Sequence, residues 1–123
     1  MSQDNTMDLL LAMELPQPQQ QQYKIKRLSA LCGQDVVFTL GQLTYNRVEQ
    51  LRQMEHESDI HIVLAGVVKP DLRSPELMSK YQAATPAELV KKLLLPGEIE
   101  DLKRAIERLC GYRQLTIEQI KKN

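Results

Sequence analysis

Apolar residues recur at helical spacing most regularly in the last third of the chain. Thr85 and Glu88 have the spacing of a capping box and predict a helix over 86–94. Pro96 has no amide hydrogen to donate and ends that helix. A second helix is expected over 98–110, because every third or fourth residue there is apolar. We predict that this stripe forms part of the core: Ile99, Leu102, Ile106 and Leu109.

End signals and charges support the second helix. Gly111 is placed to end it in a left-handed conformation. Thr116 then predicts a cap for a last short helical turn that carries Ile117 and Ile120. Two oppositely charged pairs lie four residues apart and are expected on the exposed face: Glu100 with Arg104, and Lys103 with Glu107.

The start of the chain combines a short apolar segment, residues 8–15, with a proline- and glutamine-rich linker that runs to residue 22. The segment predicts a helix that is too short to be stable alone. Two interpretations stay open, since the helix can dock on its own core or on another chain. In the second case its contact residues are Leu9, Leu10 and Met13. We therefore expect a flexible segment at 1–22 and a single domain at 23–123.

Alternation of apolar and polar residues at 23–27 and 36–40 predicts two strands, joined into an antiparallel hairpin by the turn residues at 33–35. Further helices are expected at 45–55, with Tyr45, Val48 and Leu51 facing inward, at 59–68 and at 75–81. The predicted fold class is mainly α (α+β): a small N-terminal antiparallel β-ribbon followed by a compact bundle of short helices.

Residues 59–68 fit two assignments. Their many β-branched side chains favour a buried strand. The Ser58-Asp59 start signal, a length of about ten residues and Pro70 behind the segment favour a helix. We assign a helix.

The composition limits the classes of partner. The chain has 123 residues, and its 16 basic and 16 acidic side chains give no net charge, so no net field attracts nucleic acid or an anionic membrane. The first twenty residues lack the basic start of a signal peptide. We expect a soluble protein that stays where it is made. Five basic residues without interleaved aromatics are interpreted as a solvated face: Lys24, Lys26, Arg27, Arg47 and Arg52.

No residue pattern indicates catalysis. Cys32 and Cys110 form no Cys-x-x-Cys pair and are expected to be small buried side chains. His56 and His61 lie about 140° apart around a helix, so one helix cannot direct both to one ion. Neither a nucleophile–base pair nor a glycine-rich phosphate loop is present. The expectation is a non-enzyme without cofactor or metal.

One set of motifs resembles a known family. Leu95-Pro96-Gly97-Glu98-Ile99 precedes the 98–110 helix, Leu109-Cys110-Gly111-Tyr112 follows it, and the chain ends in Ile120-Lys121-Lys122-Asn123. This arrangement is similar to that of the XkdN-like tail assembly chaperones of phages with long contractile tails and of defective prophages. The resemblance extends loosely back to about residue 23. Its motif residues are Pro96, Gly97, Glu98, Gly111, Lys122 and Asn123.

The resemblance implies a function. Such chaperones bind and coat the tape measure protein non-covalently and reversibly in the host cytoplasm, and are absent from the mature virion. It also implies a longer form made by a −1 frameshift near Lys121–Asn123. The edge of the predicted strand at 23–27 and the apolar segment at 9–13 leave surface that a lone domain cannot easily satisfy, so we expect self-association or a complex with the tape measure protein. From their residue type alone, Tyr81 and Tyr112 are candidate binding residues, although a position at the rim of the core is the ordinary explanation for such a tyrosine. Two alternatives stay open: a structural tube or connector protein retained in the virion, and a regulatory interaction protein unrelated to phage.

Overall fold

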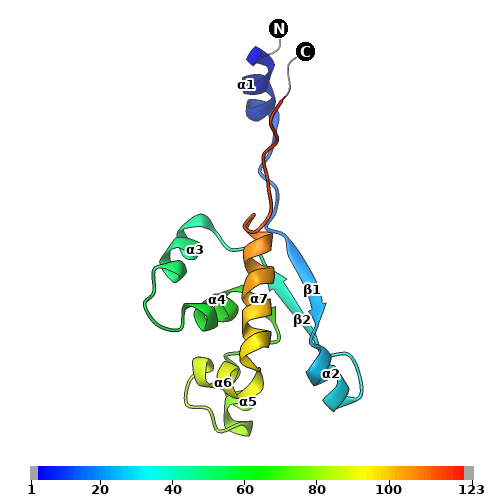
Figure 1. Cartoon of the computed structure of the whole chain (residues 1–123), viewed down its shortest axis with the longest axis vertical. Coiled ribbons are helices and arrows are strands. Elements are labelled where there is room, and N and C mark those ends of the chain that lie inside the picture. The colour runs from blue at the N-terminus through cyan, green and yellow to red at the C-terminus, as the bar shows by residue number, and fades with distance from the viewer. Residues whose placement is uncertain (1–2, 121–123) are drawn as a thin grey trace.

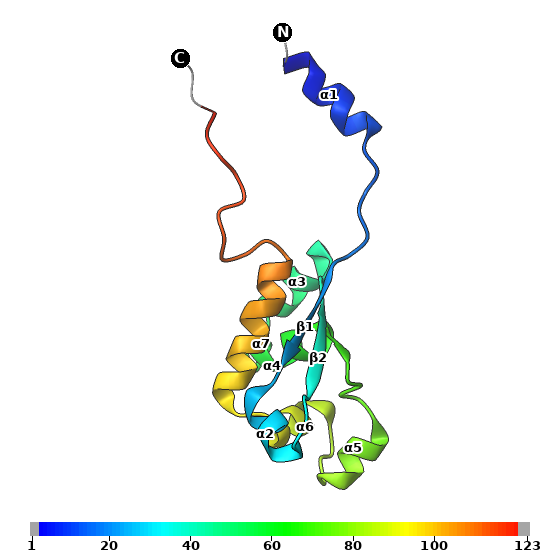
Figure 2. The same ribbon diagram turned by 90° about the vertical axis from the view of Figure 1, so that its right-hand side faces the viewer.

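The computed structural model describes residues 3–120, which form seven helices and three strands (Figure 1). In chain order the elements are α1 Gln3–Ala12, β1 Gln20–Lys24, α2 Lys26–Cys32, β2 Val37–Gly41, α3 Tyr45–Arg52, α4 Ser58–Gly66, β3 Val67–Lys69, α5 Pro75–Lys80, α6 Pro86–Leu93 and α7 Pro96–Leu109. The elements from β1 to α7 pack together as the body. α1 and the last described residues project from one end of it (Figures 1 and 2).

The three strands form one antiparallel sheet in the order β1-β2-β3. β1 pairs with β2 along its whole length, with Tyr23 opposite Phe38. β3 pairs with the other edge of β2, where Lys69 lies opposite Thr39. The predicted fold class is confirmed as mainly helical with a small antiparallel sheet. The third strand was not predicted.

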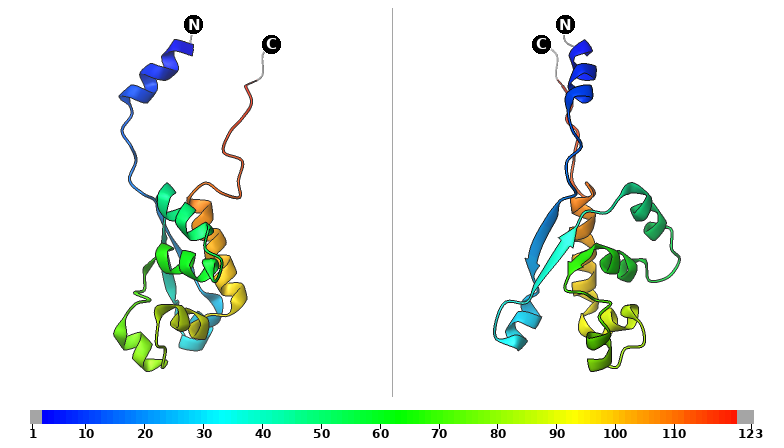
Figure 3. Two further views of the ribbon diagram at one scale, coloured as in Figure 1. Left: turned by 90° about the vertical axis from the view of Figure 1, so that its left-hand side faces the viewer. Right: turned by 180° about the vertical axis from the view of Figure 1, so that it is seen from behind.

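Helix α7 packs against both β2 and α4 (Figure 3). It therefore connects the sheet to the other helices of the body. Its apolar stripe faces inward: Ile99, Leu102 and Ile106 are buried, and Leu109 is half-buried against the core. The core that these side chains share with the sheet and the other helices includes Phe38, Leu40, Leu51, Val63, Leu72, Val90 and Leu94.

The end of α4 touches α7 at Gly66. A Cβ atom at this position would lie 2.5 Å from Cδ1 of Ile106 and 2.7 Å from its Cγ1. Carbon atoms pack at about 3.5–4.0 Å, so only glycine permits this approach. Ile106 is 0% exposed and fills the space that a side chain at residue 66 would need.

The sequence prediction misplaced the first strand. β1 lies at Gln20–Lys24 instead of 23–27, and Lys26 and Arg27 belong to α2. Three glutamines of the predicted linker are therefore part of the sheet. Glutamine has no strong preference for strands, but backbone pairing with β2 fixes these residues regardless of side-chain type.

The segment 59–68 contains elements of both assignments. A helix is present up to Gly66, and Val67 and Val68 then form β3. The prediction of a helix is thus confirmed for most of the segment. It is wrong for the last two residues, because they belong to a strand that pairs with β2.

Both terminal predictions need correction. The first helix ends at Ala12 and begins before residue 8, although the amide of Met13 still donates to the carbonyl of Leu9 at 3.1 Å. No helical turn follows Thr116 within the described residues. The residues from Leu115 to Ile120 contact no surface that would stabilise a single turn, and an isolated turn is unstable in water.

Three side-chain predictions also fail. Tyr45 is 77% exposed at the start of α3, whereas Val48 and Leu51 are buried as expected. Cys32 is exposed on α2, and Cys110 is partly exposed. Glu107 does not pair with Lys103, because it is buried and paired with arginines from elsewhere; the Glu100–Arg104 pair is present at 2.8 Å.

The close approach of α4 and α7 generates a stability prediction. We expect Gly66→Ala to lower the free energy of unfolding by about 1–3 kcal/mol, because the added methyl group overpacks against Ile106. Gly97→Ala is the matched control, since a Cβ there meets nothing within 4 Å. Urea denaturation of both variants measures the difference. An unchanged urea midpoint for Gly66→Ala would contradict the prediction, because it would show that α4 and α7 can move apart without loss of stability.

Candidate protein-binding surfaces

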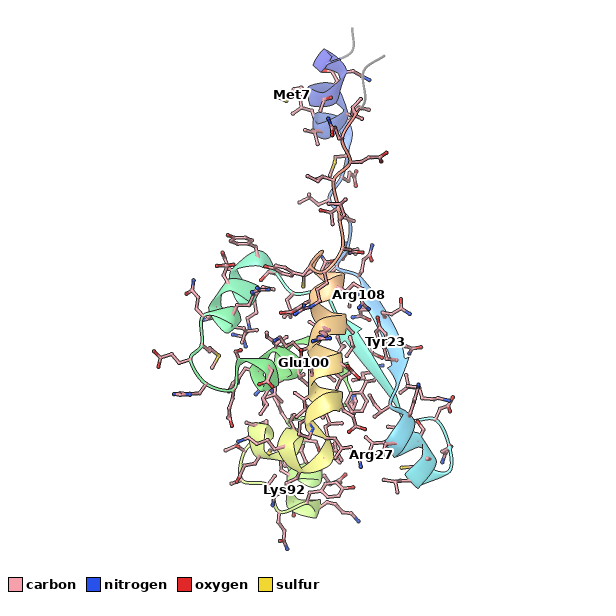
Figure 4. All side chains as sticks on the ribbon, in the orientation of Figure 1. Met7, Tyr23, Arg27, Lys92, Glu100 and Arg108 are labelled. Carbon is pink, nitrogen blue, oxygen red and sulfur yellow. The ribbon has the colours of Figure 1, made fainter. Side chains whose placement is uncertain are left out.

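An N-terminal arm, residues 3–19, exposes large apolar side chains away from the body. It consists of α1 and an extended coil that joins α1 to β1 (Figure 2). Its large apolar side chains are 52–86% exposed: Met7, Leu9, Leu10, Leu11, Met13 and Leu15. Figure 4 shows Met7 on α1, well away from the body. An exposed apolar group of this size marks an interaction surface in a folded protein.

The structure places the three predicted contact residues, Leu9, Leu10 and Met13, on this arm. Sequence reasoning missed Met7 and Leu11. Together with Leu10 they have the i, i+3, i+4 spacing of one helical face, and this signal would have found them.

A C-terminal tail, residues 115–120, leaves the body at the same end as the arm (Figures 1 and 2). It has no regular structure, and Leu115, Ile117 and Ile120 are exposed. Two apolar segments therefore project from one end of the molecule.

A groove of about 580 Å³ runs between α7 on one side and β1 with the start of α2 on the other. Its lining includes the buried apolar residues Ile25, Leu102 and Ala105. A smaller hollow continues this groove to the end of the body where the arm and the tail leave it. Tyr23 and Arg108 line both the groove and the hollow (Figure 4). Five basic side chains line the main groove against two carboxylates: Lys24, Lys26, Arg27, Arg104 and Arg108 against Glu98 and Asp101.

The groove also follows a free sheet edge. β1 is the first strand of the sheet, so within residues 3–120 no strand pairs with its outer edge. Backbone donors and acceptors on that edge are available to a partner.

An ion pair fixes one end of the groove. Arg27 donates from Nε to Glu98 Oε2 at 3.0 Å and from Nη2 to Glu98 Oε1 at 2.8 Å. The same Nη2 donates to the carbonyl of Leu93 at 2.9 Å, which ties α2 to the junction of α6 and α7. The hydrogen bonds from Arg27 lower the pKa of Glu98; partial burial opposes this shift, and the amide of Leu95 adds to it.

The two candidate tyrosines lie in different environments. Tyr81 is 41% exposed where α5 ends, and is accessible to a partner. The ring of Tyr112 is partly covered, because the guanidinium of Arg52 lies 4.4 Å from its centroid. The structure does not bring either tyrosine together with the arm.

Other reactive residue types form no site within residues 3–120. No group of three histidine, cysteine or carboxylate side chains is placed to hold a metal ion. Glu57, near both histidines, is instead paired with Lys91, whose hydrogen bond lowers its pKa. In the described part of the chain, no helix has the length and apolar character needed to cross a membrane.

Comparison with known families agrees with the sequence motifs. The model of the phage XkdN-like tail assembly chaperone family matches residues 7–122, which include most of the arm and the whole body. The chain belongs to this family. The predicted resemblance is confirmed, and its general role is tail assembly.

A solved structure supports the fold of this tail assembly chaperone. The crystal structure of a protein named yqbn is similar, with a TM-score of 0.66 and 20% sequence identity over 80% of this chain and 90% of that protein. At this identity the likeness shows the fold alone. No curated protein matches the chain.

The motif residues of the chaperone have structural roles around α7. Pro96 and Gly97 open the helix, and Glu98 accepts from the amide of Leu95 at 2.7 Å while it pairs with Arg27. Gly111 has a φ of +94° and turns the chain out of the helix. Lys122 and Asn123 lie outside the described residues.

A second ion-pair cluster holds the chain after α7 in this chaperone. Glu107 is buried and accepts from Arg113 at 2.7 Å and from Arg52 at 3.5 Å. Because Arg113 follows the turn at Gly111, its bond to Glu107 fixes where the tail leaves the body.

The Arg27–Glu98 pair predicts a pH dependence. The pKa of Glu98 is lower in the folded chain than its usual value of 4.5. The charged carboxylate therefore stabilises the folded state above about pH 4.5, and this contribution is lost as the pH falls through the folded pKa. We expect Glu98→Gln to reduce the fall in urea midpoint between about pH 6 and pH 3.

The variant Arg27→Gln tests this explanation, because it removes the side chain that lowers the pKa of Glu98. The double variant is expected to show the same pH dependence of the urea midpoint as either single variant. Additive effects of the two substitutions would mean that the two side chains act independently.

Proposed function

We propose that this chaperone binds and coats the tape measure protein non-covalently and reversibly during tail assembly, and leaves before the virion is complete. Family membership supports the general role. The observation that carries the finer proposal is the apolar arm, whose six large side chains are exposed beside an otherwise closed core.

The physical requirement is to keep a long rod from aggregating. A long helical protein exposes apolar stripes until the tube forms around it, and such stripes associate with one another unless they are covered. Many small contacts that form and break independently cover a rod and still permit its release. An arm joined to the body by a linker provides one such contact for each copy.

The proposed contact residues differ in strength of support. Leu9, Leu10 and Met13 are the primary candidates, since all three are exposed on the arm. Tyr81 is a secondary candidate on the body. Tyr112 has least support, because Arg52 covers part of its ring.

Self-association and a frameshift-extended form belong to the same proposal. Copies that contact each other along the rod would coat it more completely than isolated copies. A minority longer form would add specific binding to the tape measure protein. An immunoblot for a second, larger band that shares this N-terminus tests the longer form.

A capture experiment tests the arm. We expect a tape measure fragment to retain the wild-type chain and to retain the triple variant Leu9→Ser, Leu10→Ser, Met13→Ser at least about tenfold less. Burial of one leucine contributes about 1.5–3 kcal/mol, and 1.4 kcal/mol corresponds to a factor of ten. Tyr45→Ser is the control, because this exposed side chain on α3 lies outside the arm.

Equal capture of the triple variant and wild type would contradict the role of the arm. Mass spectrometry of purified particles separates a chaperone from a retained component. The chaperone is expected in the cytoplasm of producing cells and absent from particles, whereas stoichiometric presence in particles would identify a structural tail protein.

A further inference from the structure

The zero net charge of the chain conceals two oppositely charged parts. Residues 1–19 contain three acidic side chains, Asp4, Asp8 and Glu14, and no lysine or arginine. Residues 20–123 therefore contain all 16 basic side chains but only 13 acidic ones, a net charge of +3. The part that carries the exposed apolar helix is acidic, and the part that carries the groove is basic.

The groove lining is rich in basic side chains. Five cations and two carboxylates line it, and two further carboxylates, Asp35 and Glu100, pair with lining cations from outside the lining, so the net charge of the groove with its ion-pair partners is +1. Three of the cations have carboxylate partners: Lys24 with Asp35, Arg27 with Glu98 and Arg104 with Glu100. Lys26 and Arg108 have no ion-pair partner within residues 3–120 and stand on opposite sides of the groove.

We propose that α1 of one copy docks in the groove between β1 and α7 of a second copy. The apolar residues Met7, Leu10 and Leu11 face the groove lining, and Asp8 and Glu14 lie near its unpaired cations. The lengths agree, since the ten residues of α1 span about 15 Å and the fourteen residues of α7, which form one wall, span about 21 Å.

The linker favours a second copy over the chain's own groove. Pro16 and Pro18 lie in the coil between α1 and β1, and each restricts both its own φ and the residue before it. Such a segment is extended and semi-rigid. It directs α1 away from the body in all views (Figures 1–3), whereas docking on the same body would need a sharp reversal over these residues.

This contact gives the self-association proposed above a structural basis and rests on that part of the proposal, but it forms without the tape measure protein. Each copy presents both an arm and a groove, so a copy can give its arm to one neighbour and receive the arm of another. The arm would then increase retention on a rod by linking adjacent copies, in addition to any direct contact.

Charge reversal in the full chain tests the proposal by sedimentation velocity. The arm variant is Asp8→Lys with Glu14→Lys, and the groove variant is Lys26→Glu with Arg108→Glu. We expect each to raise the dissociation constant of self-association at least about tenfold. An equimolar mixture of the two variants is expected to associate through reversed arm in reversed groove, as is a chain that carries all four substitutions.

The control reverses two charges that do not line the groove, Lys80→Glu on α5 and Lys103→Glu on α7. This variant is expected to associate like wild type. Raising NaCl from about 50 mM to about 500 mM is expected to weaken wild-type association at least about fivefold, since the contact is partly electrostatic.

Three results would overturn the proposal. One is a wild-type chain that stays monomeric, whether its α1 is free or lies in its own groove. Another is association that neither reversal weakens. The last is loss of association in both variants without recovery in the mixture or in the four-fold variant. Capture of the tape measure fragment is measured separately, with a fragment short enough to hold one copy, so that the direct contact of the arm is tested without the contact between copies.

Discussion

The contact between Gly66 and Ile106 determines the arrangement of the body. Because residue 66 lacks a Cβ, the end of α4 lies directly against α7, and the chain continues from that point into β3, which completes the sheet. α7 is thereby held between α4 and β2. Its position in turn defines the groove, since α7 is one wall and β1 the other. The two ion-pair clusters, Arg27 with Glu98 and Glu107 with its arginines, then fix the two ends of α7.

A closed body with an exposed arm suits the reversible binding that we propose. The core is complete without α1, so the arm can bind and release without unfolding the rest. The arm combines apolar side chains with acidic charge, whereas the groove combines apolar lining with basic charge. Such complementarity favours the correct partner and speeds encounter more than it increases affinity, as the proposed reversible coating requires.

The sequence predicted correctly those helices whose limits are set by neighbouring residues, through apolar spacing and capping. The stripe and the end signals of α7 placed that helix within two residues at its start and one at its end, and the capping hydroxyl of Thr85 accepts from the amide of Glu88 at 3.1 Å. Several of the failures concern pairing that depends on tertiary structure. The glutamines of β1 form a strand because β2 lies beside them, and no signal within the segment reveals this. Glu107 has the spacing of an exposed pair with Lys103, but it is buried and pairs with Arg113, beyond the turn at Gly111, and with Arg52, which lies 55 residues away. The arm was recognised from composition, whereas the groove that we propose as its receptor depends on tertiary structure throughout.

The central claim is that the body is ordered by itself and the arm becomes protected only in a complex. Hydrogen exchange measured by mass spectrometry tests it most directly, on the dilute chain and on the chain with a tape measure fragment or at high concentration. We expect amides of α7 to be strongly protected in every sample, and those of α1 to exchange freely when dilute, because an unpacked helix of ten residues is marginally stable. In the associated samples α1 should gain protection. Protection of α1 equal to that of α7 in the most dilute sample, or no gain on association, would contradict the account.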